Sequence, residues 1–121
     1  MQYASRAYSK AAVEIASPRQ LEAGALLTAA AKLHAVLERW RGRSADLDDA
    51  LLFNRRLWVV LIDAVLREDN KLPAAVRENV LRLGMFVMTE TFSAMTAPRP
   101  DHLESIIKIN RGLAKGLNDK A

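Results

Sequence analysis

Four prolines divide this chain into segments in which apolar residues recur every three or four positions. A proline ring fixes φ and removes the amide hydrogen, so proline is tolerated mainly at helix starts and in turns. Between the prolines the apolar spacing is that of α-helices, and no stretch shows the alternation that a sheet needs. The sequence therefore predicts an all-α fold, a small antiparallel helical bundle of three long helices with a short N-terminal helix and a C-terminal helix. The prolines are Pro18, Pro73, Pro98 and Pro100.

Capping residues predict the bounds of the longer helices. Ser17-Pro18-Arg19-Gln20 has the form of a capping box, and Gly42 stands where a residue just past a helix end is expected. Asp101 is a candidate cap for the last helix, and Gly112 and Gly116 are expected to loosen its end. The predicted helices run over about residues 18–41, 44–67 and 73–97, and from about 101 onward.

The start of the chain is poorer in large apolar residues than the rest. We expect a single domain over residues 1–121 and a short helix over about 3–16 within it. Because this helix has little to bury, residues 1–16 are interpreted as a mobile or partner-docking helix, with loose packing on the edge of the bundle as the alternative. Its apolar stripe consists of Met1, Ala4, Tyr8, Ala11 and Ile15.

The segment over 44–67 carries apolar residues on more than one side. One stripe includes Trp58, and a second includes Phe53 and Val60, so we expect this to be the central helix of the bundle. Gly84 interrupts a stripe of the following helix. A glycine inside a helix costs about 1 kcal/mol against alanine, so it is interpreted as a site where two helices cross closely.

Composition limits the class of protein. The 121 residues include 18 Lys and Arg, 14 Asp and Glu and no cysteine, for a net charge of +4. The missing cysteines exclude disulfides and thiolate zinc sites. The longest apolar run, 57–66, is interrupted by Asp63, whereas a membrane-spanning helix needs roughly 20 apolar residues, and the N-terminus lacks the apolar core of a signal peptide. We therefore expect a chain that is neither exported through a cleaved signal peptide nor bound to a membrane.

Residues for catalysis or metal binding are few. Only His34 and His102 supply imidazole; they lie on different predicted helices, and His34 is expected to pair with Glu38. An acidic stretch at 46–49 is similar to the start of a calcium loop, but leucine stands at the required glycine and glutamate positions. No phosphate-binding glycine loop occurs. These observations argue against an enzyme, a metal, a cofactor or a small-molecule substrate.

A basic cluster, Arg39-Trp40-Arg41-Gly42-Arg43, is the best candidate for binding nucleic acid. Arginines can engage phosphates, and an exposed indole can stack on a base. A capped helix end is the favoured reading, because arginines in a last helical turn complement the dipole and Trp40 continues the apolar seam. The pair Arg55-Arg56 is interpreted as an exposed helix edge.

Two asparagines stand on apolar stripes, Asn54 and Asn110. A buried amide without hydrogen-bond partners destabilises a fold by about 1–3 kcal/mol. Each is therefore expected to bond a facing helix or to bind a partner's backbone, and internal bonding is the favoured alternative.

Four motifs stand in order along the chain: Ala16–Glu22, Phe53–Trp58, Leu83–Met88 and Ile107–Leu113. In order and spacing they resemble the flagellar biosynthesis regulator FlaF over nearly the whole chain. This resemblance implies a cytoplasmic bacterial protein needed for flagellin synthesis and filament assembly. It also implies work with a second regulator, FlbT, which acts on flagellin mRNA. The family offers no settled catalytic residues to transfer.

The resemblance leads us to expect a flagellin-binding, chaperone-like regulator that promotes flagellin production or secretion by capturing an amphipathic helix in a groove. Met85, Met88 and Met95 would adapt to a partner, or simply fill the core. The alternative is a translational regulator that contacts flagellin mRNA or acts as an adaptor for FlbT. RNA contact would use Arg39, Arg41, Arg43 and Arg55. The expected partner-binding residues are Arg19, Glu22, Asn54, Arg55, Trp58, Asn110 and Arg111.

Overall fold

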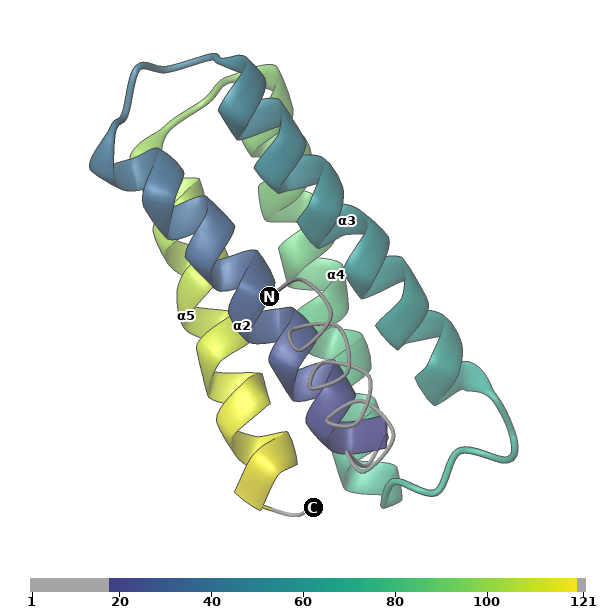
Figure 1. The fold of residues 1–121 in the computed structure, drawn as a ribbon. Coiled ribbons are helices and arrows are strands. Elements are labelled where there is room, and N and C mark those ends of the chain that lie inside the picture. The colour runs from purple at the N-terminus through teal and green to yellow at the C-terminus, as the bar shows by residue number, and fades with distance from the viewer. Residues whose placement is uncertain (1–17, 120–121) are drawn as a thin grey trace, which may run out of the picture.

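The computed structural model describes residues 18–119, which form four helices and no strand (Figure 1). The all-helical, bundle-like prediction is therefore confirmed for this part of the chain. The short helix expected over about 3–16 lies outside the described residues. The helices are α2 (Pro18–Glu38), α3 (Ala45–Leu66), α4 (Ala74–Thr96) and α5 (Pro100–Asp119).

The start of α3 follows from its local sequence. Ser44 has an extended backbone, and its hydroxyl accepts a hydrogen bond from the Leu47 amide at 3.1 Å. Asp46 and Asp48 occupy the first turn, where negative charge is favourable. Pro73 lies directly before α4, and Pro100 is the first residue of α5. The helix start predicted at about residue 73 is confirmed, whereas the predicted cap Ser17 lies outside the described residues.

The predicted end of the first long helix, at about residue 41, needs correction. Helix α2 ends at Glu38, so Arg39 and Arg41 follow the helix instead of completing its last turn, and the dipole explanation for them is wrong. Gly42 adopts a left-handed φ of 73° within the turn over 39–44. Trp40 is half-buried against the core, as expected.

Helix α5 continues through both of its glycines to Asp119, so the expectation of a loosened end is wrong. Leu113, Ala114 and Leu117 are buried beside the glycines, and this packing holds the last turns despite their low helix propensity. Asp101 lies inside the first turn and is not its cap.

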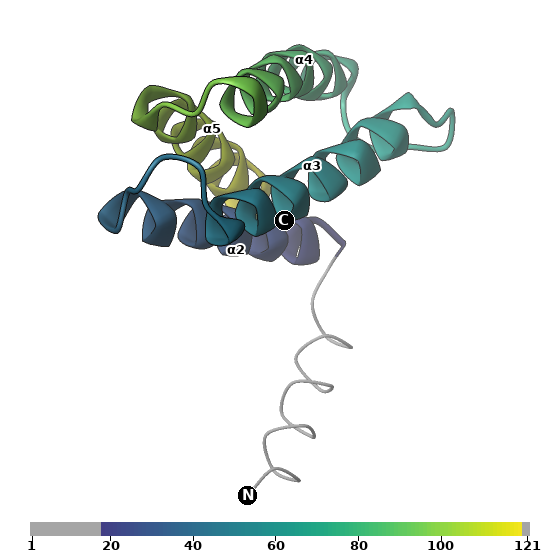
Figure 2. The same cartoon turned by 90° about the horizontal axis from the view of Figure 1, so that it is seen from above.

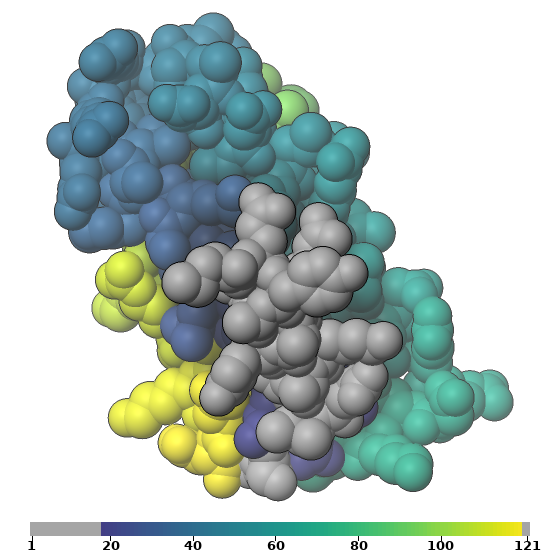
Figure 3. Space-filling view, viewed as in Figure 1, coloured from purple at the N-terminus to yellow at the C-terminus, as the bar shows by residue number. Residues whose placement is uncertain are grey.

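Each helix packs against two others. Helix α2 packs most extensively on α5, and the remaining contacts join α2 to α3, α3 to α4 and α4 to α5. Figures 1 and 2 show this closed arrangement, and Figure 3 shows the yellow end of α5 beside the purple start of α2. The prediction that the segment over 44–67 is central is therefore wrong, since α3 buries one stripe and exposes both flanks, including Val59 and Val60.

The crossing of α3 and α4 depends on Gly84. A Cβ atom at this position would lie 2.8 Å from Ile62 Cδ1 and 3.4 Å from Trp58 Cε3. The first distance is shorter than van der Waals contact allows, so any side chain here would force the helices or Ile62 to move. The predicted close helix crossing is confirmed.

Candidate partner-binding groove

A chain of hydrogen bonds crosses the core between α3 and α5. Trp58 Nε1 donates to Asn110 Oδ1 at 3.0 Å, and Asn110 Nδ2 donates to Asn54 Oδ1 at 2.7 Å. All three side chains are completely buried. Asn54 Nδ2 has no hydrogen-bond partner among the described residues. This network fixes how α3 and α5 face each other, because another register would leave several buried polar groups unpaired.

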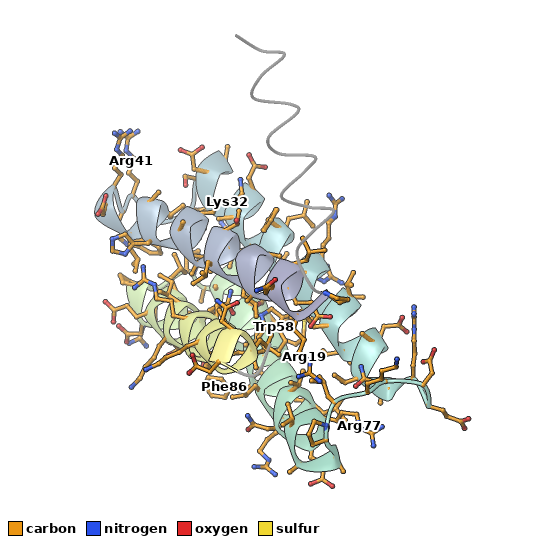
Figure 4. The ribbon with its side chains drawn as sticks, turned by 60° about the horizontal axis from the view of Figure 1, so that its bottom comes forward. Arg19, Lys32, Arg41, Trp58, Arg77 and Phe86 are labelled. Carbon is orange, nitrogen blue, oxygen red and sulfur yellow. The ribbon has the colours of Figure 1, made fainter. Side chains whose placement is uncertain are left out.

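The network decides the role of three predicted partner-binding residues. Asn54, Trp58 and Asn110 have no accessible side-chain surface, so a partner cannot touch their side chains in this fold. Figure 4 shows Trp58 inside the bundle, whereas Arg41 projects from the end of α2. Internal bonding, the favoured alternative for the two asparagines, describes what the structure shows.

The other four predicted residues do not gather into one site. Arg55 and Arg111 each follow a core asparagine by one position, roughly 100° around the helix, and are exposed on α3 and α5 respectively. Arg19 and Glu22 lie at the start of α2. The structure thus groups Asn54, Trp58 and Asn110 in the core and places Arg19 and Glu22 together at the start of α2. It does not bring all seven predicted residues into one site.

Glu22 has an unusual environment for a carboxylate. It is half-buried in a small hollow that it shares with Leu61, Val65 and Leu117. Burial raises the pKa of the Glu22 carboxyl, and the positive charge of Arg19 opposes that rise. The ionised form of Glu22 thus carries a desolvation cost that a fully exposed carboxylate would not have.

An apolar groove lies between the first half of α4 and the second half of α5. It has a volume of about 620 Å³ and opens to solvent. Its walls are mostly aliphatic, and Lys108 is the one charged side chain among its lining residues in the described chain. The principal lining residues are Leu72, Val76, Leu83, Ile109, Leu113 and Leu117.

Two glycines keep this groove open. Gly112 and Gly116 line it one helical turn apart, and a Cβ atom at either position would meet nothing within 4 Å. Their bare backbone would let a second helix approach α5 closely, as small residues spaced by four allow. Sequence reasoning assigned them to a frayed helix end and missed the groove; their spacing of four beside Leu113 and Leu117 was the available signal.

Two of the four motifs meet at this groove. Leu83 comes from the motif on α4, and Lys108, Ile109 and Gly112 come from the motif on α5. Farther along the two helices, Glu90 Oε2 and His102 Nδ1 form a hydrogen bond of 2.6 Å that links α4 to α5. Residues of two recognised motifs therefore line the groove, and a hydrogen bond outside it joins the same two helices.

The basic cluster forms a surface of mixed charge. Arg43 donates to the Met95 carbonyl oxygen at 2.8 Å and so ties the start of α3 to the end of α4. Arg39 and Arg41 border a hollow that is also lined by Glu38, Asp46 and Asp49. These carboxylates would repel phosphate groups, so the arrangement does not favour an RNA-binding surface.

We also searched residues 18–119 for metal sites, histidine pairs and membrane-spanning helices. This part of the chain holds no group of three or more His, Cys, Asp or Glu side chains placed to bind a metal ion. The predicted pair of His34 and Glu38 is confirmed, with 2.9 Å between Nε2 and Oε1. Among the described helices, none combines the length and the apolar character needed to cross a bilayer.

Comparison with family models identifies a family for this chain. The model of a family described as flagellar protein FlaF matches residues 4–117, which is most of the chain. No curated protein and no solved structure gives a significant match.

Proposed function

This chain belongs to the FlaF family of flagellar proteins, and on that premise we propose that it is a flagellin-binding, chaperone-like regulator in the cytoplasm. It would promote flagellin production or secretion without catalysing a reaction. The observation that carries the proposal is the apolar groove between α4 and α5, which motif residues line from both sides.

The groove suits an amphipathic helix. Such a helix presents apolar side chains at positions i, i+3, i+4 and i+7, which can enter a groove lined by Leu83, Ile109 and Leu113. Gly112 and Gly116 allow its backbone to lie close to α5. The terminal segments of flagellin, as the family resemblance implies, are amphipathic helices that aggregate when exposed, and covering them is a chaperone's task.

Charge adds a preference for the sequence of the bound helix. Lys108 lines the groove, and no carboxylate does so among the described residues. A bound helix is therefore favoured when an aspartate or glutamate lies beside its apolar face. Methionine contributes differently from the expectation, because Met88 packs against the core while Met85 and Met95 are exposed outside the groove.

Filling the groove tests the proposal. Gly112→Leu places a side chain in open space, so the fold should tolerate it and even gain about 1 kcal/mol of helix propensity. We expect this variant to bind purified flagellin at least about tenfold more weakly than the parent chain in calorimetric titration. Gly24→Leu is the matched control, because Gly24 is also a helical glycine with nothing within 4 Å of its Cβ position, but it lies on α2.

The outcomes separate the candidate roles. Binding by the parent chain and the Gly24 variant, with loss in the Gly112 variant, supports flagellin capture in the groove. If the parent chain does not bind flagellin at micromolar concentration but binds FlbT, the adaptor role replaces the proposal. If the parent chain binds a flagellin leader transcript with an affinity that falls steeply as the salt concentration rises, the RNA alternative is supported instead.

A further inference from the structure

A second apolar surface lies on the other side of α4. We call it the α3–α4 strip and define it by six large exposed side chains from the two helices. Four of them are more than half exposed, which is unusual for leucine, valine, methionine and phenylalanine in a folded domain. The residues and their exposed fractions are Leu52 40%, Val59 52%, Leu66 63%, Met85 73%, Phe92 69% and Met95 43%.

Geometry joins these residues into one surface. On α3, Val59 and Leu66 lie one turn to either side of Ile62, and Ile62 packs over Gly84 of α4. This flank of α3 therefore faces α4, and Leu52 continues it at a spacing of seven. On α4, Met85 and Phe92 share the same spacing of seven. The strip thus follows the seam between the helices.

The ends of the two helices are also matched. The bond from Arg43 to the Met95 carbonyl places the start of α3 beside the end of α4, and the turn over 67–73 joins their other ends. Leu52 accordingly lies toward Met95, and Leu66 lies toward the start of α4. The exposed side chains extend along most of the paired length of α3 and α4.

The exposed area is large for a monomer. A large apolar side chain presents about 150–250 Å² when fully exposed, so the six together leave roughly 600 Å² in water. This is at the upper end of the apolar patches that monomeric proteins show, about 300–600 Å². Two such strips in full contact would bury at most about 1,200 Å², the lower limit of specific protein interfaces, about 1,200–2,000 Å².

The charges beside the strip are balanced. Asp48 and Arg55, fourteen and seven residues before Ile62, lie within the strip on the row of α3 that faces α4. Glu78 continues the row of Met85 and Phe92 on α4, and Arg82 lies beside it. None of the four forms an ion pair with another described residue. A surface with two charges of each sign complements itself when a second copy is turned to face it, because an arginine of one copy can meet a carboxylate of the other.

We propose that the α3–α4 strip is a two-fold interface between two copies of this chain. The spacing of seven is the one that long helices use when they pack along a common seam. Leu83, in the wall of the groove, lies two positions from Met85 and so on the opposite flank of α4. The dimer would therefore leave the α4–α5 groove of each copy open, and the inference does not rest on flagellin binding.

Adjacent valines on α3 provide a matched test. Val59 belongs to the strip, whereas Val60 is 64% exposed on the other flank, in a shallow hollow with Phe53 and Leu57. Leu52, at the edge of the strip, also borders this hollow. Both sites are exposed enough for glutamate to leave the fold intact, which circular dichroism would verify. Sedimentation equilibrium should show a dimer for the parent chain and for Val60→Glu. For Val59→Glu the dimer dissociation constant should rise at least about 100-fold, because a carboxylate of each copy is buried.

Crosslinking gives a second measurement, since the chain has no cysteine of its own. Met85→Cys should yield a covalent dimer with a short bis-maleimide, and Val60→Cys should not. A monomeric parent chain throughout the micromolar range would overturn the proposal, as would equal dissociation by glutamate at both valines. Monomers that bind another protein through the strip would show that a different partner occupies this surface, which also overturns the two-fold interface.

Discussion

Asn110→Leu should be the most damaging single change in the buried hydrogen-bond chain. Asn110 accepts from Trp58 Nε1 at 3.0 Å and donates to Asn54 Oδ1 at 2.7 Å. Leucine is similar in size but can form neither bond. Because all three side chains are completely buried, water cannot replace the lost partners.

The magnitude follows from counting the groups left without a partner. A buried donor or acceptor that loses its partner costs about 1–3 kcal/mol. Asn110→Leu leaves one such group on Trp58 and one on Asn54, so the free energy of unfolding should fall by about 2–6 kcal/mol. Asn54→Leu leaves only Asn110 Nδ2 unpaired and removes Asn54 Nδ2, which already lacks a partner, so the loss should be about 0–2 kcal/mol.

Urea unfolding followed by circular dichroism measures these losses, provided that the slope of the free energy of unfolding against urea concentration is the same in all variants. The double variant carries a stricter test. With both asparagines replaced, only Trp58 Nε1 stays unpaired, so Asn54→Leu should partly restore the stability of Asn110→Leu. The reasoning is refuted if Asn54→Leu alone is as destabilising as Asn110→Leu, or if the two losses simply add.

Three further changes test local features of the fold. Gly84→Ala should destabilise by about 1 kcal/mol, since overpacking against Ile62 outweighs the gain in helix propensity, and Ile62→Val should relieve it in urea unfolding. Ser44→Ala should cost about 1 kcal/mol through the lost cap, whereas Ser44→Asp should not. The raised pKa of Glu22 means that its ionised form is disfavoured by folding, so the cost is present above the folded pKa and absent below the unfolded one. Glu22→Gln should therefore raise the urea midpoint at pH 7, with a smaller gain near about pH 4; a loss at pH 7 would contradict this.

Much of the helical architecture could be predicted because its causes are local. The cap at Ser44, the prolines before α4 and at the start of α5, and the buried stripe of α3 depend on residues within one or two turns. The error at the end of α2 has a local origin too. Gly42 has the expected left-handed backbone, but the helix ends four residues earlier, so glycine marks the turn and not the helix end.

The candidate site could be predicted only in part. The motifs contain residues of the buried network and of the groove wall. Their positions in the chain could not show that Trp58 is buried and Arg55 exposed, because both belong to one motif. Phe53 and Val60 show the same limit, because an apolar residue on a helix flank is buried only if another helix covers it.

The sequence by itself determined the all-helical class, the approximate helix bounds, the close crossing at Gly84 and the flagellar family, because each rests on short-range spacing or on a motif. Only the tertiary structure decided that α2 packs on α5, that Trp58 and Asn110 bond across 52 positions, and that Leu83 and Gly112 line one groove. Which helix faces meet depends on the combined burial of all four helices, and no single helix contains that information.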